Sequence, residues 1–177
     1  AVSGDTLGAL VRVRRTDPRA PERFWFGTIP CESSAADGWR EGPLPAFDLS
    51  EQTHLFARAG TFALTGMADG GAALAILRDA SWSVERIARI DGALAPRALL
   101  GGFELDKRTV LVDRVSLDAG SGVIRLGLLR DHAVQPWAEF AEPARPWSVG
   151  GIGTQALVLE IGDQARAMVR ALPFLRS

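Results

Sequence analysis

The chain has no tyrosine and no asparagine, and its 177 residues include one lysine (Lys107), one cysteine (Cys31) and two histidines. A single cysteine excludes an intrachain disulfide, and two distant histidines without further thiolate or imidazole ligands exclude a structural zinc site. Lysine and arginine together number 20, so 19 of them are arginines. Because Arg, Ala and Gly use GC-rich codons, this composition predicts a bacterial protein from a GC-rich genome.

The charge balance excludes several classes of partner. The formal net charge is −1, so no overall field attracts the chain to nucleic acid or to anionic lipid. No run approaches the ~18 apolar residues that would span a bilayer. The first residues lack the basic and apolar regions of a signal peptide, although a signal removed before residue 1 would leave no trace. We therefore expect a cytoplasmic protein that binds neither nucleic acid nor membrane and carries no cofactor or metal.

The clearest local pattern is a β-hairpin between residues 108 and 129. Apolar and other residues alternate over Arg108–Leu117 and again over Val123–Leu129, and the loop between them contains two glycines. A weaker version precedes it, with strands predicted over Gly60–Met67 and Ala72–Arg78. The return strands end in similar tetrapeptides, Ile-Leu-Arg-Asp at 76–79 and Leu-Leu-Arg-Asp at 128–131. The similarity indicates either a duplication or two hairpins whose return strands have the same structural role.

The remaining segments have weaker patterns, from which we predict further strands, a loop and two helices. Further strands are expected over residues 10–14, 23–29, 82–90 and 155–161. Residues 49–59 favour a short helix with Ser50 as N-cap, whereas residues 30–47 favour a long loop. Asp163 resembles the N-cap of a C-terminal helix over Gln164–Leu172, whose apolar face would hold Ala165, Met168, Val169 and Leu172.

These elements predict a mainly β protein. About eight short strands with one or two short helices, and no strand–helix–strand alternation, favour an antiparallel β-sandwich or barrel over a doubly wound sheet. We expect one domain over residues 1–177, in which residues 147–177 form at most a strand–helix appendage after a proline-rich run.

Few residues are candidates for catalysis. Asp131 and His132 form an adjacent acid–imidazole pair where a strand leaves the sheet, and Glu104 and Glu139 are candidate carboxylates for glycosidase-type chemistry. A surface histidine and a solvated sheet edge explain the same residues without any activity. The glycine-rich segment 150–154 resembles a phosphate-binding loop, but a strand rather than a helix follows it, which favours a turn.

Tryptophans beside arginine or proline give the second set of candidates. Trp39, Trp137 and Trp147 lie in sequence typical of loops, next to Arg40, Pro136 and the Arg145-Pro146 pair. Such a ring can cover the protein's own core, anchor a protein interface or stack on a sugar. Trp25, in an aromatic-rich strand, is expected in the core.

The sequence favours a non-catalytic β-rich domain that acts through protein–protein contacts or self-association in a bacterial assembly. Its candidate contact residues are Trp39, Arg40, Trp137, Arg145 and Trp147. Two alternatives stay open. One is a hydrolase or lyase that uses carboxylates or His132 with arginine as an anion clamp. The other is a glycan-binding or small-ligand-binding sandwich that uses the loop tryptophans.

Overall fold

The structure is a computed structural model that describes residues 1–13, 23–33, 38–50, 53–87, 89–90, 99–116, 122–152, 154–161 and 167–172. The chain divides into two compact units, residues 1–88 and residues 89–177, and each is described by itself. Sixteen strands lie within the described residues. The protein is therefore mainly β, as the alternation of apolar residues predicts.

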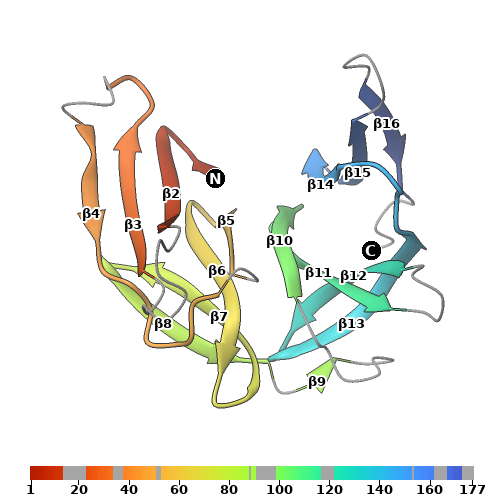
Figure 1. Cartoon of the computed structure of the whole chain (residues 1–177), viewed down its shortest axis with the longest axis horizontal. Coiled ribbons are helices and arrows are strands. Elements are labelled where there is room, and N and C mark those ends of the chain that lie inside the picture. The colour runs from red at the N-terminus through yellow and green to blue at the C-terminus, as the bar shows by residue number, and fades with distance from the viewer. Residues whose placement is uncertain are drawn as a thin grey trace. The chain divides into compact units, whose positions relative to one another are not determined.

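Unit 1 contains two four-stranded antiparallel sheets (Figure 1). The first consists of β1 (Val2–Ser3), β2 (Thr6–Val13), β3 (Arg23–Pro30) and β4 (Arg40–Gly42). The second consists of β5 (His54–Arg58), β6 (Thr61–Ala68), β7 (Gly71–Arg78) and β8 (Ser81–Arg86). Each strand pairs with the next in sequence, so both sheets are meanders, the unit that β-propeller folds repeat.

Unit 2 contains a five-stranded and a three-stranded sheet. The larger consists of β10 (Leu99–Leu105), β11 (Arg108–Ser116), β12 (Gly122–Arg130) and β13 (Ala133–Ala141), with β9 (Arg89–Ile90) parallel to β13. The smaller consists of β14 (Trp147–Ile152), β15 (Gln155–Ile161) and β16 (Ala167–Ala171). In the sequence, the proline-rich run after Ala141 connects these two sheets.

Two-residue turns connect many of these strands. Both central residues have positive φ in the turns Ala59-Gly60, Asp69-Gly70, Asp79-Ala80, Asp106-Lys107 and Asp131-His132. Such turns match the right-handed twist of paired strands, and they tolerate Asp and Gly best at positive φ. Aspartate at the first turn position in four of them therefore has a structural explanation.

Large side chains of one sheet pack onto glycines of another within each unit. In unit 1 the Phe26 ring packs edge-on against Phe62 and Trp82, with centroids 6.1 Å and 5.0 Å apart. A Cβ on Gly8 would lie 2.6 Å from the Phe62 ring. In unit 2 a Cβ on Gly151 would lie 2.9 Å from the Leu105 side chain. These glycines let neighbouring sheets approach closely enough to pack.

The expected single sandwich or barrel is wrong. Because consecutive strands pair through tight turns, the chain forms four small sheets instead of two large ones with long crossing connections. The predicted hairpins are confirmed: the stronger is β11–β12 and the weaker is β6–β7.

Both helix predictions fail in the described residues. Ala167–Ala171 is the edge strand β16, in which Met168 and Val169 point to opposite faces, and residues 162–166 lie outside the described part. His54–Arg58 is strand β5. In each case hydrogen bonding to a neighbouring strand outweighs a weak local helix preference. The predicted loop 30–47 likewise contains strand β4.

Candidate functional site

The structure places Asp131 and His132 at the two central positions of the turn between β12 and β13. Their φ values are 47° and 61°, and both residues are exposed. Because a type I′ turn needs positive φ at both positions, the turn accounts for the aspartate without a catalytic role. The two residues therefore occupy the positions that a hairpin turn of this type requires.

Glu104 and Glu139 lie on the first and the last strand of the β10–β13 meander. Glu104 is on β10 opposite Thr109, and Glu139 is on β13 opposite Arg125. Two strands separate β10 from β13, which places the two backbones ~14 Å apart at ~4.8 Å per strand spacing. Paired carboxylates of glycosidases need ~5–9.5 Å, so these two glutamates do not form such a pair.

The sequence reasoning missed a buried ion pair on the same sheet. Asp113 and Arg125 lie opposite each other on β11 and β12, and Arg125 Nη2 donates to Asp113 Oδ2 at 2.5 Å while Nε donates to Oδ1 at 3.3 Å. Their side chains are only 9% and 14% exposed. A charged residue inside each of two apolar runs was the available signal. This carboxylate and guanidinium are buried and paired with each other, so neither group is available for a substrate.

Trp137 and Trp147 lie in strands rather than loops. Both are partly buried and pack against the core of unit 2, and the Trp147 ring meets Phe140 edge-on with centroids 5.9 Å apart. Arg145 is exposed in the segment between β13 and β14. Of the three roles possible for such rings, these two tryptophans therefore have that of covering the protein's own core.

Trp39 and Trp25 are the exposed tryptophans of unit 1. Trp39 is 42% exposed and lies directly over Gly27, where any Cβ would collide with the indole. Trp25 is 46% exposed, so its predicted place in the core is wrong. The reason is strand parity, since Phe24 and Phe26 turn inward and Trp25 between them must turn outward. Arg40 is exposed on β4 opposite Thr28, and side chains at that position point to the sheet face away from Gly27.

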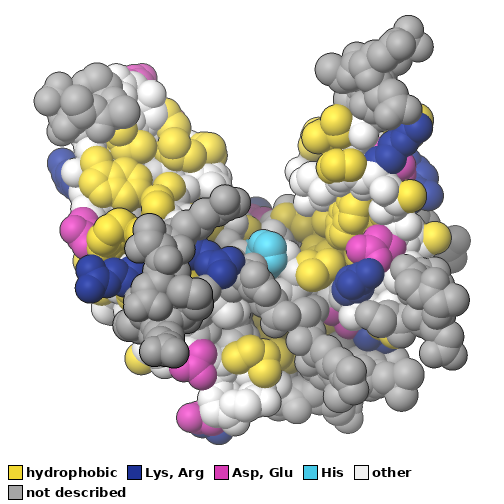
Figure 2. Space-filling model, viewed as in Figure 1, with side chains coloured by type: hydrophobic (Ala, Val, Ile, Leu, Met, Phe, Trp, Pro, Cys, Tyr) yellow, Lys and Arg dark blue, Asp and Glu magenta, His cyan; other side chains and the backbone are white. Residues whose placement is uncertain are grey.

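These rings belong to an exposed apolar surface on the first sheet, which we call the aromatic face. Val2 pairs with Leu7, Val11 pairs with Trp25, and alternation places all four on the side of the sheet that Trp39 covers. Each is at least 40% exposed. Figure 2 shows hydrophobic side chains gathered over β2 and β3. The aromatic face therefore consists of Val2, Leu7, Val11, Trp25 and Trp39.

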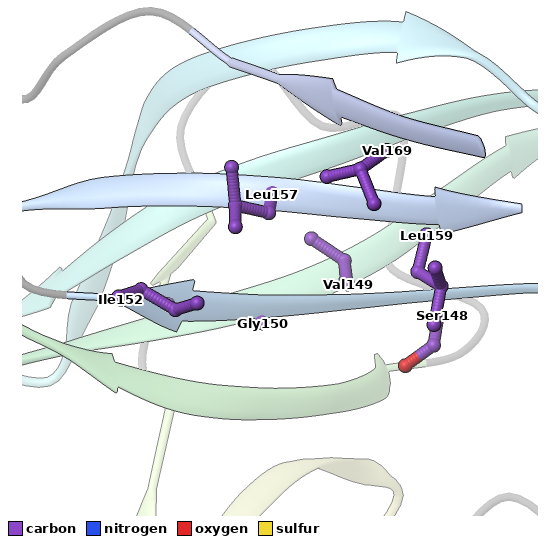
Figure 3. A pocket seen from close by; sticks show the side chains of 8 residues that line it. Ser148, Val149, Gly150, Ile152, Leu157, Leu159 and Val169 are labelled. Carbon is purple, nitrogen blue, oxygen red and sulfur yellow. The ribbon is translucent and has the colours of Figure 1, made fainter. Parts of the chain in front are cut away.

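A second exposed apolar surface, which we call the aliphatic face, lies on the sheet β14–β16. Cross-strand pairing and alternation place its residues on the side away from the unit 2 core: Ile152, Leu157, Leu159, Ile161 and Val169. Ile152 is 71% exposed and Val169 is 63% exposed. A hollow of about 320 Å³ on this face is lined by Ile152, Leu157, Leu159 and Val169 and by residues 148–151 (Figure 3). Apart from its chain neighbours, Gly150 has no atom within 4 Å of its Cβ position.

Both surfaces consist mainly of apolar side chains. The residues that line the hollow carry no ionisable group. Within the described part of the chain, no three His, Cys, Asp or Glu residues gather as a metal site would require. Cys31 is a free, exposed thiol, and burial lowers the pKa of His54 on β5. No helix in the described segments has the length and apolar character needed to cross a membrane.

Comparison with protein-family models, with curated proteins and with solved structures gives no match to this chain. Function is therefore inferred from its own residues.

Proposed function

We propose that this chain is a non-catalytic binding domain that acts through protein–protein contacts, with the aromatic face as its contact surface. The observation that carries the proposal is the exposure of Trp25 and Trp39, which lie beside each other on one apolar sheet face. Tryptophan in the centre of an apolar patch is the residue type that most often dominates interface energies. Exposed contiguous apolar surface on a folded protein marks such contacts.

The composition of the aromatic face fits a protein partner. Its centre holds aliphatic and indole side chains, and the charged residues on the same side, Arg23 and Glu41, lie at its margins. An apolar centre with a charged rim is the usual anatomy of a protein interface. The bacterial assembly expected from the composition stays a prediction.

A photocrosslinking experiment tests the proposal. A photoreactive phenylalanine analogue replaces Leu7 on the aromatic face, and a control chain carries it at Lys107, in an exposed turn of unit 2. We expect protein adducts from position 7 that disappear when Trp25 and Trp39 are both changed to Ala. Adducts of equal yield at position 107, or none at position 7, would contradict the proposal.

The same two rings also suit a sugar, which is the specific observation favouring the second candidate function. A glycan that stacks on Trp25 or Trp39 would change the tryptophan emission, and the change would vanish in Trp25→Ala. An emission spectrum that stays constant across a glycan panel would remove this candidate and leave the protein-binding proposal intact. The hydrolase or lyase alternative has less support, because Glu104, Glu139 and His132 do not converge.

A further inference from the structure

Strand β16 is one edge of the three-stranded sheet β14–β16 (Figure 1). We propose that this edge binds an extended peptide segment of another protein, which joins the sheet as a further strand. The contact goes beyond the aromatic face, because it recognises the backbone of its partner. The partner is defined by its chemistry: an extended segment with an apolar residue opposite Val169 and an acidic residue opposite Arg170.

One row of backbone groups on β16 makes no bond to another described strand. In an antiparallel pair, residues that exchange hydrogen bonds alternate with residues that do not. The Leu172 N–H donates to the Ala156 carbonyl at 2.9 Å, which fixes this alternation along β16. Arg170 and Met168 therefore bond to β15, whereas the N–H and C=O of Val169 between them point away from it. Because no other described strand pairs with this edge, these groups can bond to a further strand.

The other sheet edges among the described strands are short, covered or charged. Strands β1, β4 and β9 have only two or three residues. Strand β5 lies against β1 and β2, and β10 and β14 lie against each other. Strand β8 ends in Glu85 and Arg86, and charged side chains discourage the addition of a strand. Strand β16 has five residues without proline or glycine, so it is the edge that these features protect least.

The charged residue of β16 does not protect its free edge. The Arg170 guanidinium lies over the Phe140 ring, 5.3 Å from its centroid, and Nη2 lies 3.8 Å from Glu160 Oε1. Phe140 belongs to β13 and Glu160 to β15, so the guanidinium leans back over the sheet instead of past the edge. The Arg170 side chain is still 50% exposed, and opposite charges on neighbouring strands attract each other. An acidic residue opposite Arg170 is therefore favoured.

Side chains on both faces of β16 leave room for a strand beside it. Met168 and Val169 point to opposite faces, and they are 50% and 63% exposed. A strand that paired with this edge would cover part of both, because directly opposite side chains lie ~4.5–5.5 Å apart. Strand addition of this kind takes its affinity from main-chain hydrogen bonds and its specificity from alternate side chains. An apolar residue opposite Val169 meets this second requirement.

A synthetic peptide tests the proposal. The probe is fluorescein-labelled Thr-Val-Glu-Leu-Thr-Val-Thr, whose leucine lies opposite Val169 and whose glutamate lies opposite Arg170 in the antiparallel register. Fluorescence anisotropy measures its dissociation constant for the full chain, and we expect saturable binding. The control peptide carries an N-methyl group on the leucine, which removes one main-chain donor. We expect it to bind about tenfold more weakly, and this comparison leaves the protein unchanged.

Two protein variants locate the binding site. Val169→Pro removes an N–H of the free edge but no bond to β15, and edge strands tolerate proline. We expect binding about tenfold weaker, with unchanged circular dichroism. Val84→Pro is the matched control, because the Val84 N–H also points away from the neighbouring strand, at the edge of β8, and binding should not change. Arg170→Ala should weaken binding about threefold, and a probe with glutamine in place of glutamate should remove this difference.

Three results would overturn this inference: no saturable binding up to about 1 mM probe, equal binding of the N-methylated probe, or equal binding to Val169→Pro. Light scattering adds a fourth. A wild-type chain that associates, and that Val169→Pro makes monomeric, would show that a second copy fills the edge instead. Crosslinking from position 7 is independent of the probe. Adducts there without probe binding would refute this inference alone, whereas probe binding without adducts would refute only the role of the aromatic face.

Discussion

The second sheet of unit 1 and the larger sheet of unit 2 share a meander of four antiparallel strands, and they differ at a buried cross-strand pair. In β5–β8 and in β10–β13 the third strand ends at an arginine, Arg78 or Arg130, and a turn that begins with aspartate and has two positive φ values follows. When the sheets are aligned on these turns, Phe56 matches Phe103, and both are buried. The return strands of the two predicted hairpins therefore have the same structural role.

The two sheets differ at one cross-strand pair on their second and third strands. Gly66 and Ala73 lie opposite each other in unit 1, and the corresponding residues in unit 2 are Asp113 and Arg125. The Phe47 ring lies against Gly66 in the first sheet, whereas the second sheet places a bidentate ion pair at this position. The same meander therefore accommodates either a glycine under an aromatic ring or an ion pair at this position. This indicates that the turns and the strand alternation, and not this pair, determine the meander.

The largest effect is expected from breaking the ion pair. Asp113→Ala leaves the Arg125 guanidinium buried without its partner, which costs ~3–5 kcal/mol of unfolding free energy. Urea denaturation followed by circular dichroism measures it. The double variant Asp113→Leu, Arg125→Met should recover most of the loss, because apolar residues of similar size replace both charges. A loss below ~1 kcal/mol in Asp113→Ala would show that the pair is solvated, as surface pairs are.

A stabilising change is expected at Thr65. Its hydroxyl oxygen is buried and has no hydrogen-bond partner in the described part of the chain, and the matching residue on β11 is Val112. An unsatisfied buried polar group costs ~1–3 kcal/mol, so Thr65→Val should raise the unfolding free energy by about 1 kcal/mol. Val112→Thr is the reciprocal variant and should lower it. Equal stability of Thr65→Val and wild type in urea would contradict an unsatisfied hydroxyl.

A smaller gain is expected in the equivalent turns. Ala80 and His132 occupy the second turn position with φ of 64° and 61°, where glycine adopts the conformation without strain. Ala80→Gly and His132→Gly should each stabilise the protein by roughly 0.5 kcal/mol, since non-glycine residues are disfavoured there by ~1–2 kcal/mol and the larger entropy that glycine loses on folding offsets part of the gain. Thermal unfolding of both variants compares the two sheets directly. A stabilisation in one sheet and a loss in the other would show that the turns are not equivalent.

The smallest expected effect is a pH dependence confined to unit 1. Burial lowers the pKa of His54 below its usual 6.5, so the unfolded chain takes up a proton more readily than the folded chain. This contribution to stability is present above pH 6.5 and is lost as the pH falls through the lower folded pKa. An NMR titration of His54 measures the pKa, and His54→Gln should remove this part of the pH dependence. A pKa at or above 6.5 would contradict this desolvation of the ring.

Local sequence predicts the hairpins well and the outward-facing residues poorly. The β11–β12 hairpin was predictable because alternation and a glycine-containing loop both indicate it. Trp25 was misplaced because an aromatic-rich strand suggests a core strand, although alternation forces every second side chain outward. Trp39 is exposed and its role as a contact residue stays a prediction, whereas Trp137 and Trp147 needed the structure to show that they cover their own core.

The sequence by itself determined a β-rich chain with tight Asp-containing turns, because these features depend on alternation and on the φ preferences of a few residues. Only the tertiary structure decided that the strands form four small sheets, that Ala167–Ala171 pairs as an edge strand, and that Asp113 meets Arg125. Each of these depends on contacts between residues on different strands, which local pattern does not encode. Local pattern also does not show which sheet faces stay exposed, because that depends on how the sheets pack against one another.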